Sequence, residues 1–589
     1  MGKGGIAITG MGIVSAIGNN SSEVLESLLK GESGIGEPRY LQSVHKELPV
    51  GEVKLSNEEI KHRLNISSEQ IVSRTTLLGM LALEEALTSS HITKKDRPKR
   101  TIFVNGTTVA GMDITEQYFS EMVHHHRHLD LLRSHDCGSC TSAIAQHAGL
   151  FSDYTTVSTA CSSALNAIII GARLIQAGEA DIVVAGGCEA LSRFHLNGFN
   201  SLMILDHERC RPFDATRVGL NLGEGAAYLV MESANSAMKR GASIFGYISG
   251  WGNACDAFHQ TASSDNGEGA CRAMGEALHT ADVSSSQIDY INAHGTGTPN
   301  NDISESAALK RVFGDNLPAI SSTKAFTGHT TSAAGSIDAV IALLAMRHNF
   351  VPANLGFSQP IPDGIVPSTG QRGCQLHHVM CNAFGFGGND SSIIISDRPT
   401  SAKTPRIDES MIVEIAGRCE IDSEEELSGL HEFIAPMEAR RMNKLMKSSL
   451  LSSLRAMHEA GVDKPDAIIT ATAWGNIDYS ERLLYQLEEG EDMLKPTWFM
   501  QSTHNTIGSN IAIRLGCHGY NITYTQGPQS LQWALRDAHQ LLQSGQCRTV
   551  LVGCHDEATP LFRELMQSLG CEAPLHSIHS LALLLTCGN

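Results

Sequence analysis

The segment TVSTACSSALNAIIIGARLIQAGEADIVVAGG (156–187) decides the fold of this chain. Its pattern predicts a strand over 155–160, a helix over 161–176 that stops at Gly178, and a second strand over 181–187. The helix is apolar nearly all round, so it should be buried inside a larger protein. Buried strands that alternate with helices predict an α/β architecture with a mostly parallel sheet.

Similar patterns extend on both sides of this unit. Residues 5–12 and 101–108 are typical of buried strands, and residues 68–88 carry apolar side chains at helical spacing. A second α/β block runs from about 243 to 397 and closes with the hairpin-like stretch CNAFGFGGNDSSIIIS (381–396). The first 400 residues therefore alternate strands and helices throughout.

Length and composition exclude several classes of protein. A chain of 589 residues is too long for one ordinary core, so two or more domains are expected. The 42% hydrophobic and 18% charged residues are typical of a globular protein. A net charge of −19 argues against nonspecific nucleic-acid binding, and an acidic partner would need a local basic patch. No apolar run is long enough to span a membrane.

Cysteine usage indicates a reducing compartment. The N-terminus does not resemble a secretion signal, and the 15 cysteines are scattered rather than paired, so a cytoplasmic location with reduced thiols is expected. Cys137 and Cys140 form a CxxC pair in HDCGSC, but no second pair stands at zinc spacing. We therefore expect no metal site.

The chain contains a linker and an internal repeat. The stretch 396–410 loses its apolar residues and gains Pro, Ser and charge, as linkers do. After it, 466–487 parallels the region that begins at Arg100, and 520–558 parallels 154–190. The predicted boundaries are two halves of one module at 1–242 and 243–398, a linker at 399–410, and a copy of the first half at 411–589.

One cysteine and two histidines suggest covalent acyl chemistry. Cys161 lies at the start of the predicted helix 161–176, where unpaired N–H groups and the positive dipole end favour a thiolate. His294 lies in NAHGTGTPNND, and His329 lies in SSTKAFTGHTTSAAG, where glycine allows close backbone approach. Each residue alone is more often structural, whereas the set of three is typical of a thiol nucleophile with imidazole partners.

Five segments together resemble the β-ketoacyl-acyl carrier protein synthases, the Cys-His-His branch of the thiolase-like superfamily. They are STACSSA (158–164), GLNLGEGAAYLVMES (219–233), NAHGTGTPNND (292–302), STKAFTGHTTSAAG (322–335) and NAFGFGGND (382–390). The resemblance covers roughly 1–398. It implies the five-layered αβαβα thiolase fold, followed here by an additional α/β half-module, and a synthase that is usually dimeric.

The resemblance also implies a role for each site residue. Cys161 would take an acyl group from acyl carrier protein, and His294 and His329 would promote decarboxylation of a malonyl thioester that then attacks the acyl group. Lys324 would order the site. The N–H groups of Cys161 and Phe386 would form the oxyanion hole, and Phe386 would gate the two steps. The product would serve fatty-acid or polyketide-like biosynthesis, such as aryl-polyene or resorcinol pathways. No cofactor is implied beyond the carrier's phosphopantetheine.

Three alternatives remain open at this stage. A degradative thiolase needs a second catalytic cysteine in a C-terminal glycine-rich loop, and Cys381 lies near such a loop, although NAFGFGG is synthase-like. A Cys-His-Asn synthase would carry asparagine in place of His329. A scaffold or chain-length-factor-like subunit without turnover would not need Cys161, His294 and His329, which are all present.

The C-terminal copy lacks the nucleophile. TQGPQSL (525–531) stands where TACSSAL stands in the first module, so Gly527 or Pro528 replaces the cysteine, depending on a one-residue choice of register. Gln526 resembles the glutamine that inactive chain-length-factor-like partners carry beside the lost cysteine, and PTWFMQSTHNTIG (496–508) is the most family-like stretch. The copy is interpreted either as a dimerisation or pocket-shaping partner or as a decayed remnant, and its packing partner stays open.

Basic residues of the copy suggest a docking surface for the acidic carrier protein. Arg440, Lys444 and Lys447 stand at i, i+4 and i+7, and Arg441 is adjacent. The prediction is that this helix docks carrier protein together with Arg211 of the first module, against the alternative of a solvated basic face. Besides carrier protein, the expected partner is a second copy or a related synthase subunit.

Overall fold

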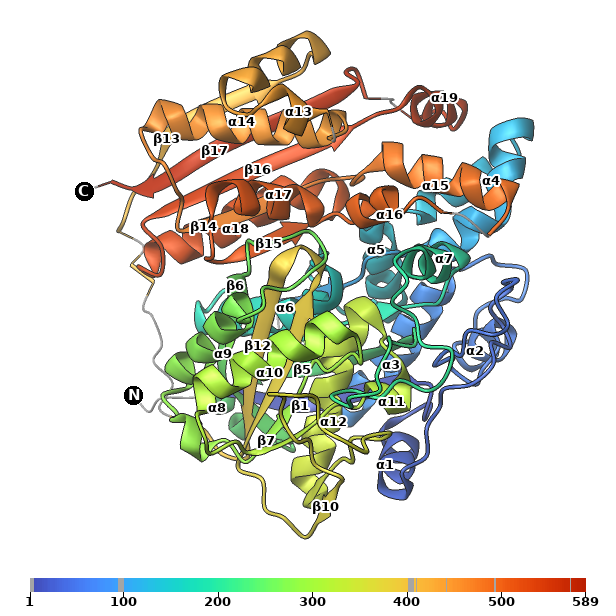
Figure 1. Cartoon of the computed structure of the whole chain (residues 1–589), viewed down its shortest axis with the longest axis vertical. Coiled ribbons are helices and arrows are strands. Elements are labelled where there is room, and N and C mark those ends of the chain that lie inside the picture. Colours follow the sequence, from blue (N-terminus) through green and yellow to red (C-terminus); the bar gives the residue numbers. More distant parts are fainter. Residues whose placement is uncertain are drawn as a thin grey trace.

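The computed structural model describes residues 5–93, 100–400, 407–408, 410–440, 442–491, 494–571 and 574–588. Figure 1 shows two lobes, with the C-terminal residues in orange and red above the blue-to-yellow remainder. Three successive blocks of strands and helices build these lobes. The α/β class predicted from the sequence is confirmed.

The first block has the following elements: β1 (Ile6–Ser15), α1 (Ser21–Lys30), α2 (Asn57–Arg63), α3 (Arg74–Ser90), β2 (Thr101–Gly106), α4 (Met112–His125), η1 (Leu129–Ser134), α5 (Cys137–Ala148), β3 (Asp153–Val157), η2 (Ala160–Ser162), α6 (Ser163–Gln176), β4 (Ile182–Glu189), α7 (Arg193–Ser201), β5 (Gly225–Ser233) and α8 (Ala234–Lys239). The second block has β6 (Gly246–Cys255), α9 (Glu268–Ala281), η3 (Ser285–Gln287), β7 (Tyr290–Asn292), α10 (Pro299–Phe313), β8 (Ala319–Ser321), α11 (Lys324–Thr327), η4 (Thr331–Ala333), α12 (Ala334–His348), β9 (Phe350–Val351), β10 (Gln371–Arg372), β11 (His378–Gly385), η5 (Phe386–Gly388) and β12 (Asn389–Ser396).

The third block, called the half-module below, has β13 (Val413–Ile421), η6 (Glu424–Glu432), α13 (Pro436–Ala439), α14 (Lys444–Ala460), β14 (Ala467–Ala471), α15 (Ile477–Glu489), α16 (Pro496–Ser502), α17 (Thr506–Leu515), β15 (Asn521–Tyr524), η7 (Gly527–Gln529), α18 (Ser530–Gln543), β16 (Thr549–Glu557), α19 (Pro560–Ser568) and β17 (Ile578–Cys587). The first two blocks together are called the first module.

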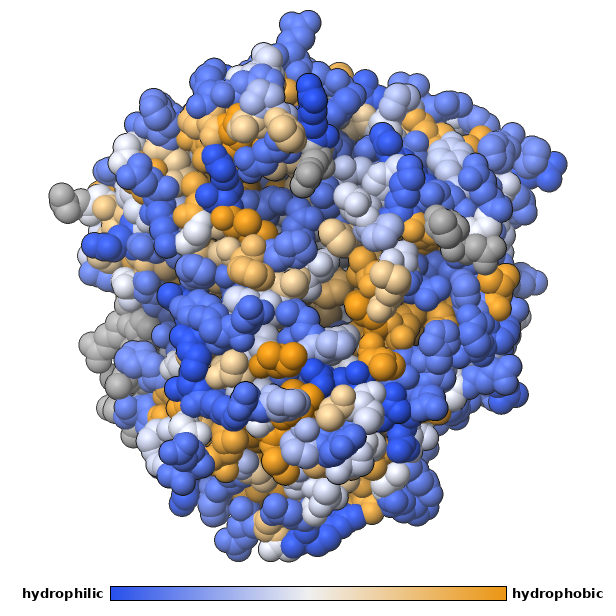
Figure 2. All heavy atoms as spheres, in the orientation of Figure 1, coloured by the Kyte–Doolittle hydropathy of each residue, from blue (hydrophilic) through white to orange (hydrophobic). Residues whose placement is uncertain are grey.

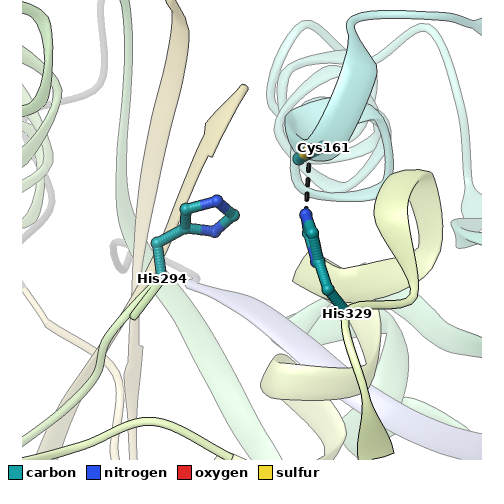
Figure 3. Close-up of side chains that lie close together, drawn as sticks. All are labelled: Cys161, His294 and His329. Carbon is teal, nitrogen blue, oxygen red and sulfur yellow. Dashed lines mark hydrogen bonds between the residues drawn. The ribbon is translucent and has the colours of Figure 1, made fainter. Parts of the chain in front are cut away.

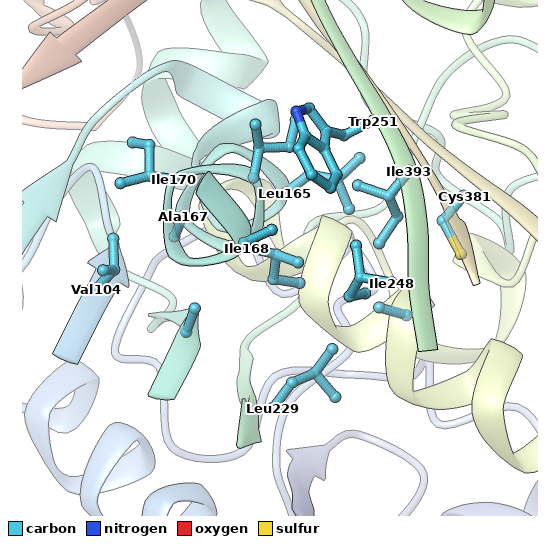
Figure 4. Close-up of a cluster of buried hydrophobic side chains, with 14 of the residues drawn as sticks. Val104, Leu165, Ala167, Ile168, Ile170, Leu229, Ile248, Trp251, Cys381 and Ile393 are labelled. Carbon is cyan, nitrogen blue, oxygen red and sulfur yellow. The ribbon is translucent and has the colours of Figure 1, made fainter. Parts of the chain in front are cut away.

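The first module is layered. Helices α6 and α12 form a middle layer between the strands β3-β2-β4-β5-β1 and the strands β6-β12-β11-β7-β8. Helices α3 and α5 cover the outer face of the first set, and α9 and α10 cover the outer face of the second. Figure 4 shows part of the middle layer, where Leu165 and Ile168 of α6 contact strand residues such as Leu229 and Ile248. A helix that is apolar nearly all round is stable here because apolar strands lie on both of its sides.

The half-module repeats the strand order of the first block. Its strands run β15-β14-β16-β17-β13, which matches β3-β2-β4-β5-β1 element by element. The two sets join where β15 pairs antiparallel with β3, at Tyr524 and Val157, so that one 15-stranded sheet runs through the chain. The half-module therefore packs on its own chain, a point that the sequence left open.

Buried polar contacts hold the two modules together. Arg173 of α6 donates to Asp537 of α18 at 2.5 Å, and both side chains are more than nine-tenths buried. The hydroxyl groups of Tyr520 and Tyr524 also donate to Asp537, at 2.8 and 3.0 Å. Such a pair is costly to break because it leaves a charge buried without a partner.

Some predicted boundaries differ from the structure. The helix expected over 68–88 begins at Arg74, because the Ser73 side chain accepts a hydrogen bond from the N–H of Thr76 and caps it there. In the predicted linker 399–410, residues 401–406 and 409 lie outside the described residues. Among the helices that the structure describes, none has the length and apolarity needed to cross a lipid bilayer.

Candidate active site

Cys161 lies in a strained turn between β3 and α6, called the nucleophile turn (residues 159–163). Ala160, the residue before the cysteine, has a φ of 51°, in the left-handed region that side chains other than glycine seldom adopt. The Ser163 hydroxyl stabilises the turn by accepting a hydrogen bond from the N–H of Thr159 at 2.9 Å. Cys161 is 6% exposed and lines a cavity of about 400 Å³. The turn thus presents the thiol to an enclosed space.

The two histidines converge on this thiol. The Nε2 of His329 lies 3.0 Å from the Sγ of Cys161. The rings of His294 and His329 meet edge to face, with centroids 5.2 Å apart, and Figure 3 shows the three side chains facing one space. His294 follows β7, whereas His329 follows α11, so residues more than 130 positions from Cys161 meet it only through the fold.

A buried carboxyl group shapes the His294 loop. Glu305 of α10 accepts hydrogen bonds from the N–H of His294 at 2.8 Å and from the N–H of Gly295 at 2.7 Å. Burial raises the pKa of Glu305 to about 7, although these hydrogen bonds oppose the rise. This contact fixes the backbone from which the imidazole projects.

Lys324 lies behind the site rather than in it. Its Nζ pairs with the Oδ2 of Asp338 at 2.8 Å, and both side chains are buried. The positive charge of Lys324 contributes to lowering the pKa of Cys161, His294 and His329. The structure therefore places Lys324 where it acts on the site through its charge and through Asp338, and its predicted ordering role stays a prediction.

The protonation states follow mainly from burial. Burial raises the pKa of Cys161 to about 12, although the N–H of Phe386 and the charge of Lys324 oppose the rise. The backbone N–H of Cys161 at the helix start lowers this pKa as expected, but the resting thiol is not ionised, because removing the thiolate from water costs more than the helix start returns. Burial, then Lys324, lowers the pKa of His294 and His329 well below the usual range, so both imidazoles are neutral.

Phe386 lies on a glycine-rich loop next to the thiol, called the gate loop (residues 385–389). Its backbone N–H lowers the pKa of Cys161, as a donor to the thiolate does. Its ring stacks on Phe199 with centroids 5.7 Å apart. Gly387 and Gly388 both have positive φ values, 84° and 75°. These two residues allow the loop to turn beside Cys161.

Two exposed apolar side chains lie at the mouth of the cavity. Met203 and Val218 line it and are 88% and 54% exposed. On the face shown in Figure 2, hydrophobic residues gather a little to the right of the middle of the view, below the place where α7 is labelled in Figure 1. The alternative nucleophile Cys381 is fully buried inside β11 and does not line this cavity.

The structure decides the register of the C-terminal copy. Thr159 has φ −125° and ψ 45°, Gln526 has φ −115° and ψ 44°, and the next residues, Ala160 and Gly527, have φ values of 51° and 54°. Pro528 therefore stands where Cys161 stands, and Gln526 lies two positions earlier rather than beside the lost cysteine. The Gln526 side chain reaches across the module boundary, where its Oε1 accepts from the Thr156 hydroxyl at 2.7 Å.

The predicted basic helix does not exist as one helix. Arg440 caps the end of α13, and Asn443 caps the start of α14, which contains Lys444 and Lys447. The prediction of helical i, i+4, i+7 spacing is wrong because Asn443 has extended backbone and its side chain accepts from the N–H of Met446. Arg441 lies outside the described residues.

The remaining docking candidates are already paired in part. Arg211 contacts Asp206 at 3.2 Å and Glu208 at 2.8 Å, and Lys444 contacts Glu424 at 2.7 Å. Paired cations offer less free charge to an acidic partner. Carrier-protein docking at these residues stays a prediction.

The half-module supplies site residues that were not predicted individually. Phe499 of α16 packs edge-on against Phe199, and a Cβ at Gly198 would lie 2.2 Å from the Phe499 ring. Asn505 contacts the gate loop. Both residues lie in the stretch 496–508, whose family-like sequence was the available signal, but their proximity to Cys161 depends on how the half-module packs.

The comparisons with known proteins match this architecture. Models described as the β-ketoacyl synthase N-terminal domain match residues 3–237 and 418–589, and the model of its C-terminal domain matches residues 245–358. A relative from Vibrio harveyi, 3-oxoacyl-[acyl-carrier-protein] synthase 2, is 30% identical over 413 residues, which is 67% of this chain and 99% of the relative.

Two solved structures extend the match. The ishigamide ketosynthase/chain length factor is 30% identical and superposes with a TM-score of 0.63 over 67% of this chain and 100% of that one. The PfaC keto synthase–chain length factor is 17% identical, so it shows the fold alone, with a TM-score of 0.79 over 99% of this chain and 78% of that one. The predicted thiolase-like fold with an added synthase-type module is thereby confirmed, and the chain belongs to the β-ketoacyl synthase family of acyltransferases.

Proposed function

We propose that this chain is a 3-oxoacyl-[acyl-carrier-protein] synthase that condenses an acyl group held on Cys161 with a malonyl thioester. The observation that carries the proposal is the contact of 3.0 Å between the Sγ of Cys161 and the Nε2 of His329, with His294 facing the same cavity. The name of the Vibrio harveyi relative supports acyl carrier protein as the donor of both groups. Phosphopantetheine on that carrier is then the only prosthetic group involved.

The first half-reaction loads the enzyme. The Cys161 sulfur attacks the acyl thioester carbonyl as its proton passes to the Nε2 of His329, and the carrier thiol leaves with that proton. The tetrahedral oxyanion accepts hydrogen bonds from the N–H groups of Cys161 and Phe386. A proton transfer coupled to attack suits a thiol whose pKa burial raises to about 12, because the resting group is not ionised.

The second half-reaction extends the chain. The malonyl carboxylate leaves as carbon dioxide, and the electron pair moves into the thioester carbonyl to form an enolate. His294 and His329 are both neutral, and each donates a hydrogen bond to the enolate oxygen. His329 does so in the tautomer whose proton is on Nε2, which it adopts once Cys161 is acylated and no longer donates to that nitrogen. The enolate carbon attacks the acyl carbonyl, and the thiolate of Cys161 leaves and takes up a proton from water, which restores the resting thiol. The product is a 3-oxoacyl thioester two carbons longer.

The half-module shapes the acyl pocket in this proposal. A small cavity lined by Phe194, His195 and Phe499 lies beside the site, and it shares Trp474 and Ser480 with an apolar cavity of about 380 Å³. That larger cavity is lined by α4 and α5 of the first module and by α15 and α19 of the half-module. An acyl tail on Cys161 that passes Phe199 reaches this larger cavity. The volume of the cavity then limits the length of the acyl group.

The half-module also takes the place of a partner subunit. Its β15 pairs with β3 at the sheet edge next to the nucleophile turn. The ketosynthase/chain length factor neighbour supports a second synthase-type unit as the structural partner. We propose that this chain supplies that unit itself and that it works in the cytoplasm. The alternative function is that of a scaffold that binds a synthase complex without turnover.

Mass spectrometry tests the proposal and separates the alternatives. Incubation with a carrier protein that bears an acyl group should add one acyl group to the peptide that contains Cys161. Malonyl-carrier protein should then remove this group as part of a 3-oxoacyl thioester. Cys161→Ala should give neither. A chain that forms no adduct with acyl groups of several lengths is a scaffold, and that result refutes the proposal.

A further inference from the structure

A side chain of the half-module holds the gate loop. Asn505 is fully buried and lies one residue before α17. Its Nδ2 donates to the backbone carbonyl of Phe386 at 2.8 Å and to the Oδ1 of Asn389 at 2.8 Å. One amide group therefore binds two points of the loop, at Phe386 and at its last residue.

The loop lies directly against α17 at this point. A Cβ at Gly387 would lie 2.2 Å from the Oγ of Ser509 and 2.8 Å from the Nδ2 of Asn505. Gly387 also has a φ of 84°. Glycine is required here for both reasons, and the close approach leaves the loop little freedom while Asn505 holds it.

A chain of buried and half-buried amides connects the same place to the nucleophile turn. Asn389 donates to the backbone carbonyl of Asn521 at 3.0 Å, and the N–H of Asn521 donates to the Oδ1 of Asn253 at 2.8 Å. Asn253 donates to the Oδ1 of Asn166 at 2.9 Å, and Asn166 donates to the Thr159 hydroxyl at 2.9 Å. Buried amide groups of this kind specify one arrangement, because any other leaves polar atoms without partners.

We propose that Asn505 is a positioning residue through which the half-module holds the Phe386 N–H toward Cys161. Fixing the carbonyl of Phe386 restricts rotation of the residue whose N–H faces the thiol. The half-module then does more than shape the pocket, because it sets the geometry of a donor to the sulfur and to the oxyanion. The consequence for turnover rests on the proposed function, whereas the consequence for the thiol does not.

The test uses Asn505→Asp in the full chain. The substitution keeps the size of the side chain but removes both N–H donors and places a carboxylate against two acceptors. Alkylation of Cys161 by iodoacetamide at pH 8 should slow by about tenfold, and its pH profile should shift upward, as expected from losing one hydrogen bond to a charged group. The chain has 15 cysteines, so the rate is followed on the Cys161 peptide by mass spectrometry.

Asn476→Asp is the matched control. Asn476 is also a buried half-module asparagine, and its Nδ2 donates to the backbone carbonyl of Gln501 at 2.8 Å rather than to a residue of the gate loop. Its alkylation profile should equal that of the wild type. If Asn505→Asp does not fold, Asn505→Ser takes its place in the test. The shorter serine side chain cannot bridge both acceptors, so the pH profile of Cys161 alkylation should shift in the same direction. Profiles like the wild type in every folded Asn505 variant overturn the proposal.

The alkylation assay needs no thioester, so the two proposals fail separately. A wild-type chain that makes no 3-oxoacyl product while Asn505→Asp shifts the thiol profile refutes the proposed function and keeps the positioning role. In an active enzyme, Asn505→Asp should lower kcat for condensation by about tenfold and leave KM for the malonyl carrier unchanged. A rise in KM alone means that Asn505 serves binding and overturns its positioning role.

Discussion

Pro528 of the half-module occupies the position that Cys161 occupies in the first module. Each lies two residues before the first residue of the long helix of its block, and each follows a residue with positive φ, 54° at Gly527 and 51° at Ala160. The backbone that presents a nucleophile is therefore kept in both copies. The half-module has no counterparts of His294 and His329 among the residues that the structure describes, since its strands match the first block only.

Restoring a cysteine at this position should not restore chemistry. In a Cys161→Ala background, Pro528→Cys places a thiol in the same kind of turn, but the described part of the half-module has no counterpart of His329 to accept its proton and no counterpart of the second block to hold an enolate. We expect iodoacetamide to modify the new cysteine and acyl-carrier protein to leave it unmodified. Peptide mass spectrometry measures both, and a 3-oxoacyl product from the double variant contradicts the assignment of one nucleophile per chain.

Removing Lys324 should cost stability as well as activity. Lys324→Ala leaves the Asp338 carboxylate buried without its cation, a loss of about 3–5 kcal/mol in the free energy of unfolding. The exposed Lys310, whose Nζ donates to the carbonyl of Asp363 at 2.8 Å, offers a control of the same type in Lys310→Ala. Urea unfolding followed by circular dichroism compares the two. Equal losses in both variants argue against a buried ion pair behind the site.

Glu305 should make stability depend on pH in a predictable direction. Its pKa rises from 4.5 to about 7 in the folded chain, so the unfolded chain ionises first as the pH increases. The contribution of Glu305 to the free energy of unfolding is complete below pH 4.5 and is lost as the pH rises to about 7. The free energy of unfolding falls by about 3 kcal/mol over this range. Glu305→Gln should remove this contribution to the pH dependence, measured by urea unfolding at pH 5 and pH 7. The exposed Glu84→Gln serves as the control, and a slope unchanged by Glu305→Gln contradicts the shift.

Filling the cavity between the modules should shorten the acyl chains that the enzyme accepts. Ser480 lines both the small and the large cavity, so Ser480→Phe places a ring where they meet. We expect kcat/KM for long acyl groups to fall at least tenfold, about 1.4 kcal/mol, with short groups unaffected. Ser568→Phe, on the exposed face of α19, is the control. A uniform loss at every chain length indicates damage to the fold instead.

Local patterns of sequence were sufficient to predict the class of fold, the repeat, and the thiol with its two histidines. The strand–helix–strand unit at 156–187 follows from periodicity, and the short motifs around Cys161, His294 and His329 occur in a specific order. Two helix starts differ from the prediction because a single capping residue decides each of them. Ser73 makes α3 start at Arg74, and Asn443 separates Arg440 from Lys444.

Tertiary structure decided everything that depends on the contact between the modules. The pairing of β15 with β3 joins the half-module to the first module, which brings Asn505 beside the gate loop and Phe499 against Phe199. Burial in this assembly also reversed the expected pKa of Cys161, since a helix start stabilises a thiolate locally whereas desolvation depends on all surrounding atoms. The sequence by itself determined which chemical groups the chain carries and in what order, and the packing of one and a half modules determined their distances and protonation states.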